Sequence, residues 1–329
     1  MGGSDMTVQW GILSTARIND KFIAGVAESQ QSAVLAVASR DHVRAERYAS
    51  ERGIPRAYDS YEALLADPDV EAVYISLPNA LHLEWTGRAL EAGKHVLCEK
   101  PLSRRAADVR AAFDLAERHD RVLMEAFMYR HHPQTARLVD LVRSGAIGRL
   151  RVIRAAFSFH FEDPEDVRLS AALEGGALMD VGSYCVSAAR LLAGEPELVS
   201  GTQVLGGDGV DVTFTGWMRF AGEVTAHFDS GLILDDRFDL EVVGEEASLF
   251  LADPWHCRTP GIELRRAQAT EIIEIAPANS YGLEADNLAA AIRGDSAPLL
   301  GRADAEGQAA TIEALYASAD SGAPVVPAC

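Results

Sequence analysis

Short apolar runs alternate with helical stretches over the first 126 residues, and this alternation constrains the fold more than any other feature. The runs Val8–Leu13, Ala33–Ala38, Val70–Ile75, His95–Cys98 and Arg121–Ala126 each predict a buried strand. Strands that alternate with helices in this way form a mostly parallel, doubly wound sheet. We therefore predict an α/β domain over residues 1–128.

The pattern changes after this region, where longer β-like runs follow one another. They cover residues 149–161, 199–205, 211–220, 223–230, 237–244, 247–251 and 270–275, with helices expected at 133–144, 180–193, 283–293 and 303–321. Runs of strands after a βα section predict a separate α+β domain, over residues 129–329, with a large, mostly antiparallel open sheet. Phe214, Trp217, Val224 and Phe228 predict an apolar exposed face that pairs with a second copy, as a homodimer or a dimer of dimers.

Charge and cysteine content narrow the classes of partner. The net charge of -19 argues against nucleic acid and anionic membrane surfaces. Cys98, Cys185, Cys257 and Cys329 lie far apart and form no metal-ligand spacing, so we predict neither a disulfide framework nor a metal site. With no signal peptide or membrane-spanning run in the pattern, a cytoplasmic location is expected.

The first apolar run opens a strand–turn–helix unit typical of a Rossmann domain. The turn is Ser14-Thr15-Ala16-Arg17-Ile18, and a helix follows to about Glu28. Ser14, Ala16 and Asn19 occupy the positions where a dinucleotide fingerprint has its glycines, so the motif fails when taken alone. Small residues still allow close approach to a pyrophosphate, and helix N-terminal N–H groups bind anions whatever the side chains. We assign residues 14–18 to cofactor binding.

The second strand ends at Ser39-Arg40-Asp41. An acid at this position takes the ribose hydroxyls of NAD, whereas an arginine accommodates the 2′-phosphate of NADP. Ser39 and Arg40 therefore predict NADP in preference to NAD. The alternative is that Arg40 is an ordinary surface residue and that Asp41 caps the helix over 42–52.

Two further strand ends carry polar residues. Leu77-Pro78-Asn79 and His82 follow the third strand, and we expect them at the cofactor, with an equal case for Pro78-Asn79 as a plain turn and cap. Glu99 and Lys100 follow the fourth strand. A lysine at the carboxyl edge of an open α/β sheet lies where such sheets bind ligands and is suited to proton transfer. Most lysines, however, are simply solvated.

The second half contains one conspicuous element, Gly175-Gly-Ala-Leu-Met-Asp180-Val-Gly-Ser-Tyr184. Asp180 and Tyr184 are four residues apart on a predicted helix, so they project from one face. A carboxylate and a phenol together can address adjacent hydroxyls of a polyol. Alternatively, Asp180 caps the helix and Tyr184 packs in the core. The cluster Arg130-His131-His132 is a candidate lining for a cleft between the domains, and the roles of His131, His132 and Arg168 stay open.

Taken together, Gly11-Ile-Leu-Ser14, Glu99-Lys100-Pro101, Glu125-Ala-Phe-Met128 and the 175–184 element resemble the glucose–fructose oxidoreductase/inositol dehydrogenase (Gfo/Idh/MocA) family. Tyr184 stands where inositol dehydrogenases carry a histidine, which resembles the branch of NADP-dependent D-xylose dehydrogenases and dimeric dihydrodiol dehydrogenase. The resemblance implies a Rossmann domain followed by an open-sheet domain that often forms a dimer. It also implies that Lys100 and Tyr184 act at the reacting carbon while Asp180 holds the substrate.

These observations predict an NADP(H)-dependent oxidoreductase that acts on a sugar, such as an aldose, or on a related cyclic polyol or dihydrodiol. Lys100, Tyr184 and Asp180 are the expected catalytic residues, and Arg130 is expected to join them at the substrate. Two alternatives remain at this point. One is a reductase of nucleotide-linked keto-sugars, and the other is a non-catalytic dinucleotide-binding sensor.

Overall fold

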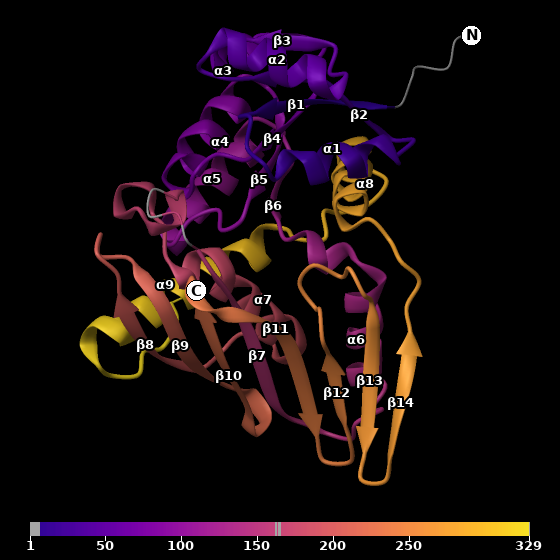
Figure 1. Cartoon of the computed structure of the whole chain (residues 1–329), viewed down its shortest axis with the longest axis vertical. Helices are drawn as coiled ribbons and strands as arrows, with labels where there is room; N and C mark the ends of the chain where they lie inside the picture. The colour runs from indigo at the N-terminus through magenta and orange to yellow at the C-terminus, as the bar shows by residue number, and fades with distance from the viewer. Residues whose placement is uncertain (1–6, 162, 164–165, 329) are drawn as a thin grey trace. The chain divides into compact units, whose positions relative to one another are not determined.

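The computed structural model describes residues 7–161, 163 and 166–328, and its chain forms two compact units (Figure 1). The first unit comprises Met1–Ser103, Ala107–Met128 and Asn279–Ala305. The second comprises Arg104–Ala106, Tyr129–Ala278 and Glu306–Cys329. Residues Asn279–Ala305 fall within the predicted second domain, 129–329, and cluster with the first unit.

The first unit is built on a six-stranded sheet in the order β3-β2-β1-β4-β5-β6, and every neighbouring pair is parallel. The predicted doubly wound α/β architecture is thereby confirmed. The short strand β3 escaped the sequence analysis because three residues are too few for a pattern. The strands are β1 (Val8–Leu13), β2 (Ser32–Ala38), β3 (Arg56–Tyr58), β4 (Ala72–Ile75), β5 (His95–Glu99) and β6 (Leu123–Ala126).

Helices from both ends of the chain accompany this sheet. Figure 1 shows α8 beside α1, although more than 250 residues separate them in sequence. A Cβ on Gly25 would lie 2.4 Å from the backbone nitrogen of Gly282, so only glycine allows these two helices to approach so closely. The helices are α1 (Asn19–Ala27), α2 (His42–Arg52), α3 (Tyr61–Leu65), α4 (His82–Glu91), α5 (Ala106–Arg118) and α8 (Ser280–Arg293).

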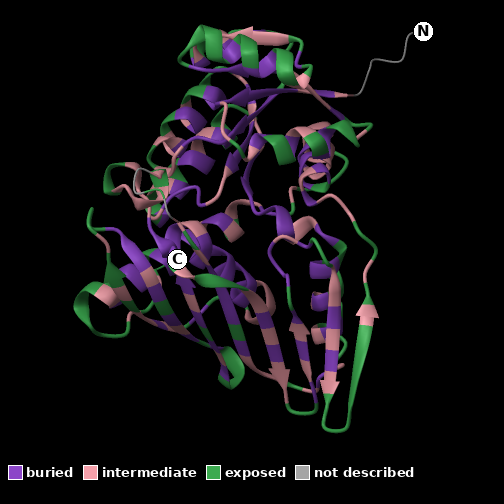
Figure 2. Ribbon diagram, viewed as in Figure 1, coloured by how far each residue is buried: buried purple, intermediate pink, exposed green. Residues whose placement is uncertain are grey.

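Burial of apolar side chains on the strands stabilises the first unit. Trp10, Phe22 and Tyr74 are fully buried, and the rings of Phe22 and Tyr74 stack with centroids 4.1 Å apart. Figure 2 shows β1, β4, β5 and β6 mostly buried, while β3 and the first half of β2 are partly exposed and the helices alternate buried and exposed residues. Near-continuous apolar strands are expected when helices cover both faces of a parallel sheet.

The second unit contains an eight-stranded sheet in the order β14-β13-β12-β11-β7-β10-β9-β8. Its pairs are antiparallel except for β10 and β7, which agrees with the predicted, mostly antiparallel sheet. The edge strand β14 is almost wholly exposed (Figure 2). The strands are β7 (Leu150–His160), β8 (Leu198–Leu205), β9 (Asp211–Phe220), β10 (Val224–Gly231), β11 (Ile233–Gly244), β12 (Ser248–Leu251), β13 (Gly261–Arg266) and β14 (Ala269–Glu274).

Helices of the second unit cover one face of this sheet. They are α6 (Pro133–Arg143), α7 (Ser183–Ala193) and α9 (Arg302–Ser321). Phe214 lies on the covered face, where its ring meets Tyr316 of α9 with centroids 5.7 Å apart and stacks on Phe228. Short helical turns complete the unit: η2 (Met128–His131), η3 (Val167–Leu169), η4 (Ala171–Leu173), the π-helical turn η5 (Leu178–Gly182) and η6 (Ala221–Glu223).

The residues chosen for an apolar open face require a correction. Phe214, Val224 and Phe228 are buried, and only Trp217 remains partly exposed. Side chains alternate between faces along a strand, so Phe214 and Trp217 cannot share a face. The opposite face of β10 carries His227 and Asp229 instead.

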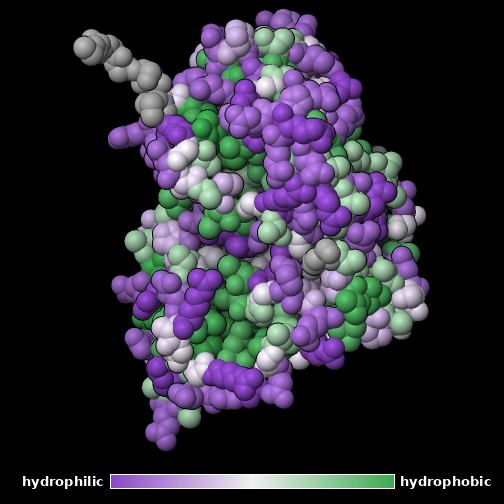
Figure 3. All heavy atoms as spheres, turned by 180° about the vertical axis from the view of Figure 1, so that it is seen from behind, coloured by the Kyte–Doolittle hydropathy of each residue, from purple (hydrophilic) through white to green (hydrophobic). Residues whose placement is uncertain are grey.

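On the face drawn in Figure 3, hydrophobic residues gather in separate areas between broad hydrophilic ones. None of the helices in the described part of the chain combines the length and the apolar character needed to cross a membrane.

Candidate active site

The turn between β1 and α1 is held by side-chain hydrogen bonds. Ser14 has a φ of 130°, a region that favours glycine, so its conformation needs support from its surroundings. Its Oγ lies 2.8 Å from Ser76 Oγ and accepts a hydrogen bond from the Ala16 N–H at 3.1 Å. The Asn19 amide donates to the Ser14 carbonyl at 3.0 Å. The degenerate fingerprint therefore keeps the backbone path of a glycine turn and replaces glycine's freedom with polar contacts.

The residues after β2 were interpreted either as contacts to the 2′-phosphate of NADP or as a surface arginine and a helix cap, and the structure agrees with part of each interpretation. Ser39 is buried and Arg40 is exposed. Burial raises the pKa of Tyr61, and the nearby charges of Arg40 and Arg44 oppose that rise. Asp41 does cap α2, since its Oδ1 accepts a hydrogen bond from the Arg44 N–H at 2.8 Å. The cap accounts for Asp41 and leaves the role of Arg40 as a prediction.

A cavity of about 190 Å³ lies next to this region, and sequence reasoning missed most of its residues. Four arginines line it together with the start of the β1–α1 turn. The recurrence of arginine along α2 is the sequence feature that could have indicated this cavity. The lining residues are Thr15, Arg17, Asp20, Arg44, Arg47, Tyr48, Glu51 and Arg52.

The ends of β4 and β5 are joined through a buried histidine. His82 Nε2 lies 2.8 Å from the Leu77 carbonyl oxygen, and Nδ1 lies 2.9 Å from that of Pro101. Burial lowers the pKa of His82. The histidine thus holds two loops at the carboxyl edge of the sheet. Asn79 begins the 3₁₀ turn η1 (Asn79–Leu81) and is half-buried, as is its neighbour Pro78.

Lys100 follows β5 directly and is half-buried, as expected for a residue at the edge of the sheet. The preceding residue, Glu99, accepts a short hydrogen bond from the buried hydroxyl of Tyr74. The following segment is fixed by Glu125, whose Oε1 accepts a hydrogen bond from the Leu102 N–H at 2.7 Å. Contacts on both sides therefore fix the backbone that carries Lys100.

In the second unit, Asp180 and Tyr184 lie on a helix that begins with the π-helical turn η5 and continues as α7. The sequence pattern predicts an ordinary helix there. Asp180 does not cap it. Asp211 Oδ2 instead accepts a hydrogen bond from the Leu178 N–H at 2.7 Å, and its Oδ1 accepts one from the Tyr316 hydroxyl at 2.8 Å. Burial raises the pKa of Asp211 to about 6. Single π-helical turns are frequent at functional sites.

Tyr184 is 8% exposed and belongs to an aromatic cluster. Its ring centroid lies 5.2 Å from that of Phe157, 5.6 Å from that of Tyr129 and 6.0 Å from that of Trp255. Close packing on three sides limits the phenol to few orientations, which favours a defined position for its hydroxyl.

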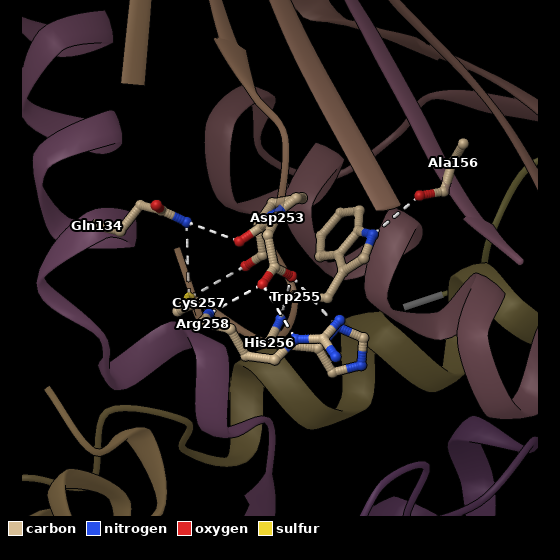
Figure 4. A network of polar contacts seen from close by, with 8 residues as sticks. Gln134, Ala156, Asp253, Trp255, His256, Cys257 and Arg258 are labelled. Atoms are coloured by element: carbon tan, nitrogen blue, oxygen red, sulfur yellow. Dashed lines mark hydrogen bonds and ion pairs between the residues drawn. The ribbon is translucent and has the colours of Figure 1, made fainter. Parts of the chain in front are cut away.

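The loop between β12 and β13 supplies Trp255 to this cluster. Figure 4 shows Trp255 with its neighbours in the loop. Trp255 donates to the Ala156 carbonyl at 2.9 Å. The loop is folded around Asp253, whose carboxylate accepts backbone hydrogen bonds from His256 at 3.1 Å and from Arg258 at 2.9 Å. Burial alone would raise the pKa of Asp253, but the His256 side chain and these backbone hydrogen bonds outweigh it and hold the pKa well below its usual range. Sequence reasoning missed this loop, because the contacts of Trp255 with the aromatic cluster join segments distant in sequence.

The cluster Arg130-His131-His132 divides by role. Arg130 donates to Ser187 Oγ on α7 at 3.2 Å, and Ser187 also accepts from Tyr129 at 2.8 Å. His132 caps α6 by accepting from the Gln134 N–H at 3.0 Å. Burial lowers the pKa of His131 to about 3, so this ring is neutral at physiological pH.

Comparison with known proteins places the chain in a family. A model of an oxidoreductase family with an NAD-binding Rossmann fold matches residues 8–127, and one of the GFO/IDH/MocA C-terminal domain matches residues 135–250. A D-xylose 1-dehydrogenase (NADP(+)) of Haloferax volcanii is 39% identical over 327 residues, which is 97% of this chain and 99% of the relative. The chain belongs to the Gfo/Idh/MocA oxidoreductase family. The resemblance predicted from the motifs is confirmed.

Two further proteins similar to this chain are named for different reactions. The human trans-1,2-dihydrobenzene-1,2-diol dehydrogenase is 36% identical over 259 residues, covering 77% of each chain. The crystal structure of KijD10, a 3-ketoreductase of Actinomadura kijaniata in complex with NADP and TDP-benzene, superposes with a TM-score of 0.89. Its sequence is 29% identical, and the match covers 95% of this chain and 98% of that one.

Proposed function

We propose that this protein is an NADP(H)-dependent oxidoreductase acting on a carbinol or carbonyl carbon of a sugar or a related cyclic polyol. The observation that carries the proposal is the 39% identity with an NADP-dependent xylose dehydrogenase along almost the whole of both chains. Lys100, Asp180 and Tyr184 are all present in this chain, as the chemistry would require.

The first unit's residues fit NADP. The β1–α1 turn has small residues at Ser14 and Ala16 and keeps a glycine-like path, which suits a pyrophosphate at the start of α1. Ser39 stands where an acid would repel a 2′-phosphate, and Arg40 beside it can make charge-assisted hydrogen bonds to that group. The neighbouring cavity is lined by four arginines and by Asp20 and Glu51, both of which pair with Arg52, and Arg44 is a further candidate contact for an anionic ligand there.

The chain's own residues would bind and orient the substrate and move one proton. When bound, NADP supplies the hydride chemistry. We assign Tyr184 as the acid/base and Lys100 as the group that orients the substrate hydroxyl and favours the phenolate, because an ammonium stabilises a neighbouring anion. Asp180 would accept hydrogen bonds from substrate hydroxyls, with Arg130 beside Ser187 as a second substrate contact. Leu77, Pro78, Asn79 and Glu99 would line the cofactor from the strand ends.

A second substrate class has support from one comparison. The structural match to KijD10, whose complex contains TDP-benzene, favours a nucleotide-linked keto-sugar that is reduced. The net charge of -19 opposes binding of a diphosphate unless the site itself is basic. The aldose or polyol is therefore the first choice.

We further propose a cytoplasmic protein that forms homodimers, or dimers of dimers, through the open face of the eight-stranded sheet. The buried free thiols of Cys98, Cys185 and Cys257 are compatible with a reducing compartment.

The test is an absorbance assay at the nicotinamide band with a panel of aldoses, cyclic polyols, dihydrodiols and a nucleotide-linked keto-sugar, each with NADP(H) and NAD(H). We expect turnover of an aldose or polyol with NADP. In Arg40→Ala the affinity for NADP should fall roughly tenfold to a hundredfold while that for NAD is little changed, since one charge-assisted bond to phosphate is lost.

Arg118→Ala, at the exposed end of α5, is the matched control and should change neither affinity. An unchanged preference for NADP in Arg40→Ala would show that Arg40 is not the selector. Turnover of the nucleotide-linked sugar alone would replace the first substrate class by the second.

A further inference from the structure

Arg168, which lies in a separate loop, forms an ion pair with Asp180, the carboxylate predicted to bind the substrate. Arg168 Nε lies 2.7 Å from Asp180 Oδ2, and both groups belong to the second unit. The Asp180 side chain is 15% exposed and that of Arg168 is 37% exposed, so the pair lies at the edge of the packed interior. An ion pair this short and this sheltered restricts the carboxylate more than a surface pair does.

Arg168 is fixed in turn by contacts with Asp166 and Phe161. Its Nη1 lies 3.2 Å from Oδ1 of Asp166, a carboxylate only 8% exposed, and the same oxygen accepts a hydrogen bond from the Arg168 N–H at 3.0 Å. The guanidinium also lies over the Phe161 ring, 5.1 Å from its centroid. The neighbouring charges of Asp180 and Asp166 raise the pKa of Arg168, so it stays charged.

The two glycines ahead of Asp180 bring this loop close. The Gly176 N–H donates to the Arg168 carbonyl at 2.8 Å. A Cβ on Gly175 would lie 2.2 Å from the same carbonyl oxygen, so a larger residue would push the Arg168 backbone away. Gly175 and Gly176 therefore serve to seat Arg168 against the turn that carries Asp180.

We propose that Arg168 is a positioning residue for substrate binding: it fixes Asp180 by engaging Oδ2, and so directs the carboxylate toward the substrate's hydroxyls. This inference rests on the proposed function, because it gives Asp180 a sugar or polyol to hold. Arg168 touches neither cofactor nor reacting carbon in this scheme. Its removal should weaken substrate binding and leave the chemical step largely intact.

The experiment compares Arg168→Met, Arg168→Lys, Asp180→Asn and the double variant Arg168→Met/Asp180→Asn on the best substrate of the wild type. We expect Arg168→Met to raise KM for the sugar about tenfold, with kcat changed less than about threefold and KM for NADP unchanged. Arg168→Lys keeps the positive charge but loses the planar guanidinium, so its KM for the sugar should lie between those of wild type and Arg168→Met. The double variant should bind sugar no worse than Asp180→Asn, because both changes remove one interaction.

Two controls separate positioning from folding. Arg151→Met removes an arginine that also lies between two carboxylates, those of Glu223 and Glu245, on the sheet of the same unit, and should leave KM unchanged. Calorimetric titration of the sugar into NADP-loaded protein should show the same loss of affinity without relying on turnover. If Arg168→Met does not fold, a raised KM in folded Arg168→Lys still supports the role, and a wild-type KM there overturns it.

The two levels of the hypothesis fail differently. A wild type that neither binds nor turns over any sugar overturns the proposed function, and the role of Arg168 with it. An active wild type whose sugar KM is unchanged in Arg168→Met overturns the role of Arg168 alone. Effects of Arg168→Met and Asp180→Asn that add in full would also overturn it.

Discussion

At the residue scale, the proposal depends on Lys100 and Tyr184. Tyr184→Phe removes the phenol oxygen and keeps the ring that packs against Phe157 and Trp255. Lys100→Met removes the ammonium at similar length. Each should lower kcat by about 10²–10⁴-fold, the usual loss for a general acid/base, while NADP binding stays nearly unchanged. The joint role proposed for the two residues predicts a double variant little worse than the poorer single one. Turnover and cofactor titration of the three variants provide the check.

Near wild-type turnover in Lys100→Met would exclude the strand-end lysine from the chemistry. Lys94→Met is unsuitable as a control, since the Lys94 ammonium is buried and donates to two backbone carbonyls. The exposed Lys21 on α1 provides a better one.

At the scale of elements, Asp211 at the start of β9 joins the π-helical turn to α9 through Leu178 and Tyr316. Its pKa is raised to about 6 from 3.8, so the folded state holds this proton more tightly than the unfolded chain does. Stability from this group is therefore fully present below about pH 4 and is lost as the pH rises through about 6. The loss is at most about 3 kcal/mol at neutral pH. In Asp211→Asn, which cannot ionise, the unfolding free energy should decline less between pH 4 and 7 than in wild type.

Denaturant unfolding at several pH values, followed by a probe in the second unit, gives this difference directly. Parallel pH profiles for the two proteins would contradict the assignment. The amide keeps an acceptor for the Leu178 N–H, so a moderate and uniform loss of stability is compatible with it.

At the scale of the whole molecule, the open face of the eight-stranded sheet is charged. Arg154 lies 3.2 Å from Glu241, Arg237 pairs with Asp229, and these residues border a cavity of about 300 Å³. A face that carries both signs can pair with itself about a twofold axis.

If a homodimer forms there, added salt should weaken it, because screened charges attract less, whereas an apolar interface would not weaken. Light scattering at micromolar concentration should give twice the chain mass at low salt, falling toward one chain in 1 M salt and in Arg237→Glu. A single-chain mass at low salt would refute the dimer.

Much of the first unit was predictable because its determinants are local. Apolar runs of strand length between helical stretches specify parallel strands, and a polar residue directly after such a run must lie at the carboxyl edge of the sheet. This reasoning placed Ser39 and Lys100 directly after β2 and β5, where the structure has them, and their role at the site stays a prediction. The same reasoning placed Asp180 and Tyr184 on one helix, although its first turn is π-helical.

The rest was decided by contacts between segments distant in sequence. Gly25 and Gly282 bring α8 to the first unit, and neither glycine carries a sign of its partner. Strand alternation separates Phe214 from Trp217, but only the packing of α9 decides which of them is covered. Arg168 meets Asp180 because a loop folds back over two glycines, and Asp211 rather than Asp180 accepts the hydrogen bond from the Leu178 N–H. Local patterns specify an element and its faces, since these depend on neighbours along the chain; which face is buried, and which charge finds which partner, depends on long-range packing that only the folded chain provides.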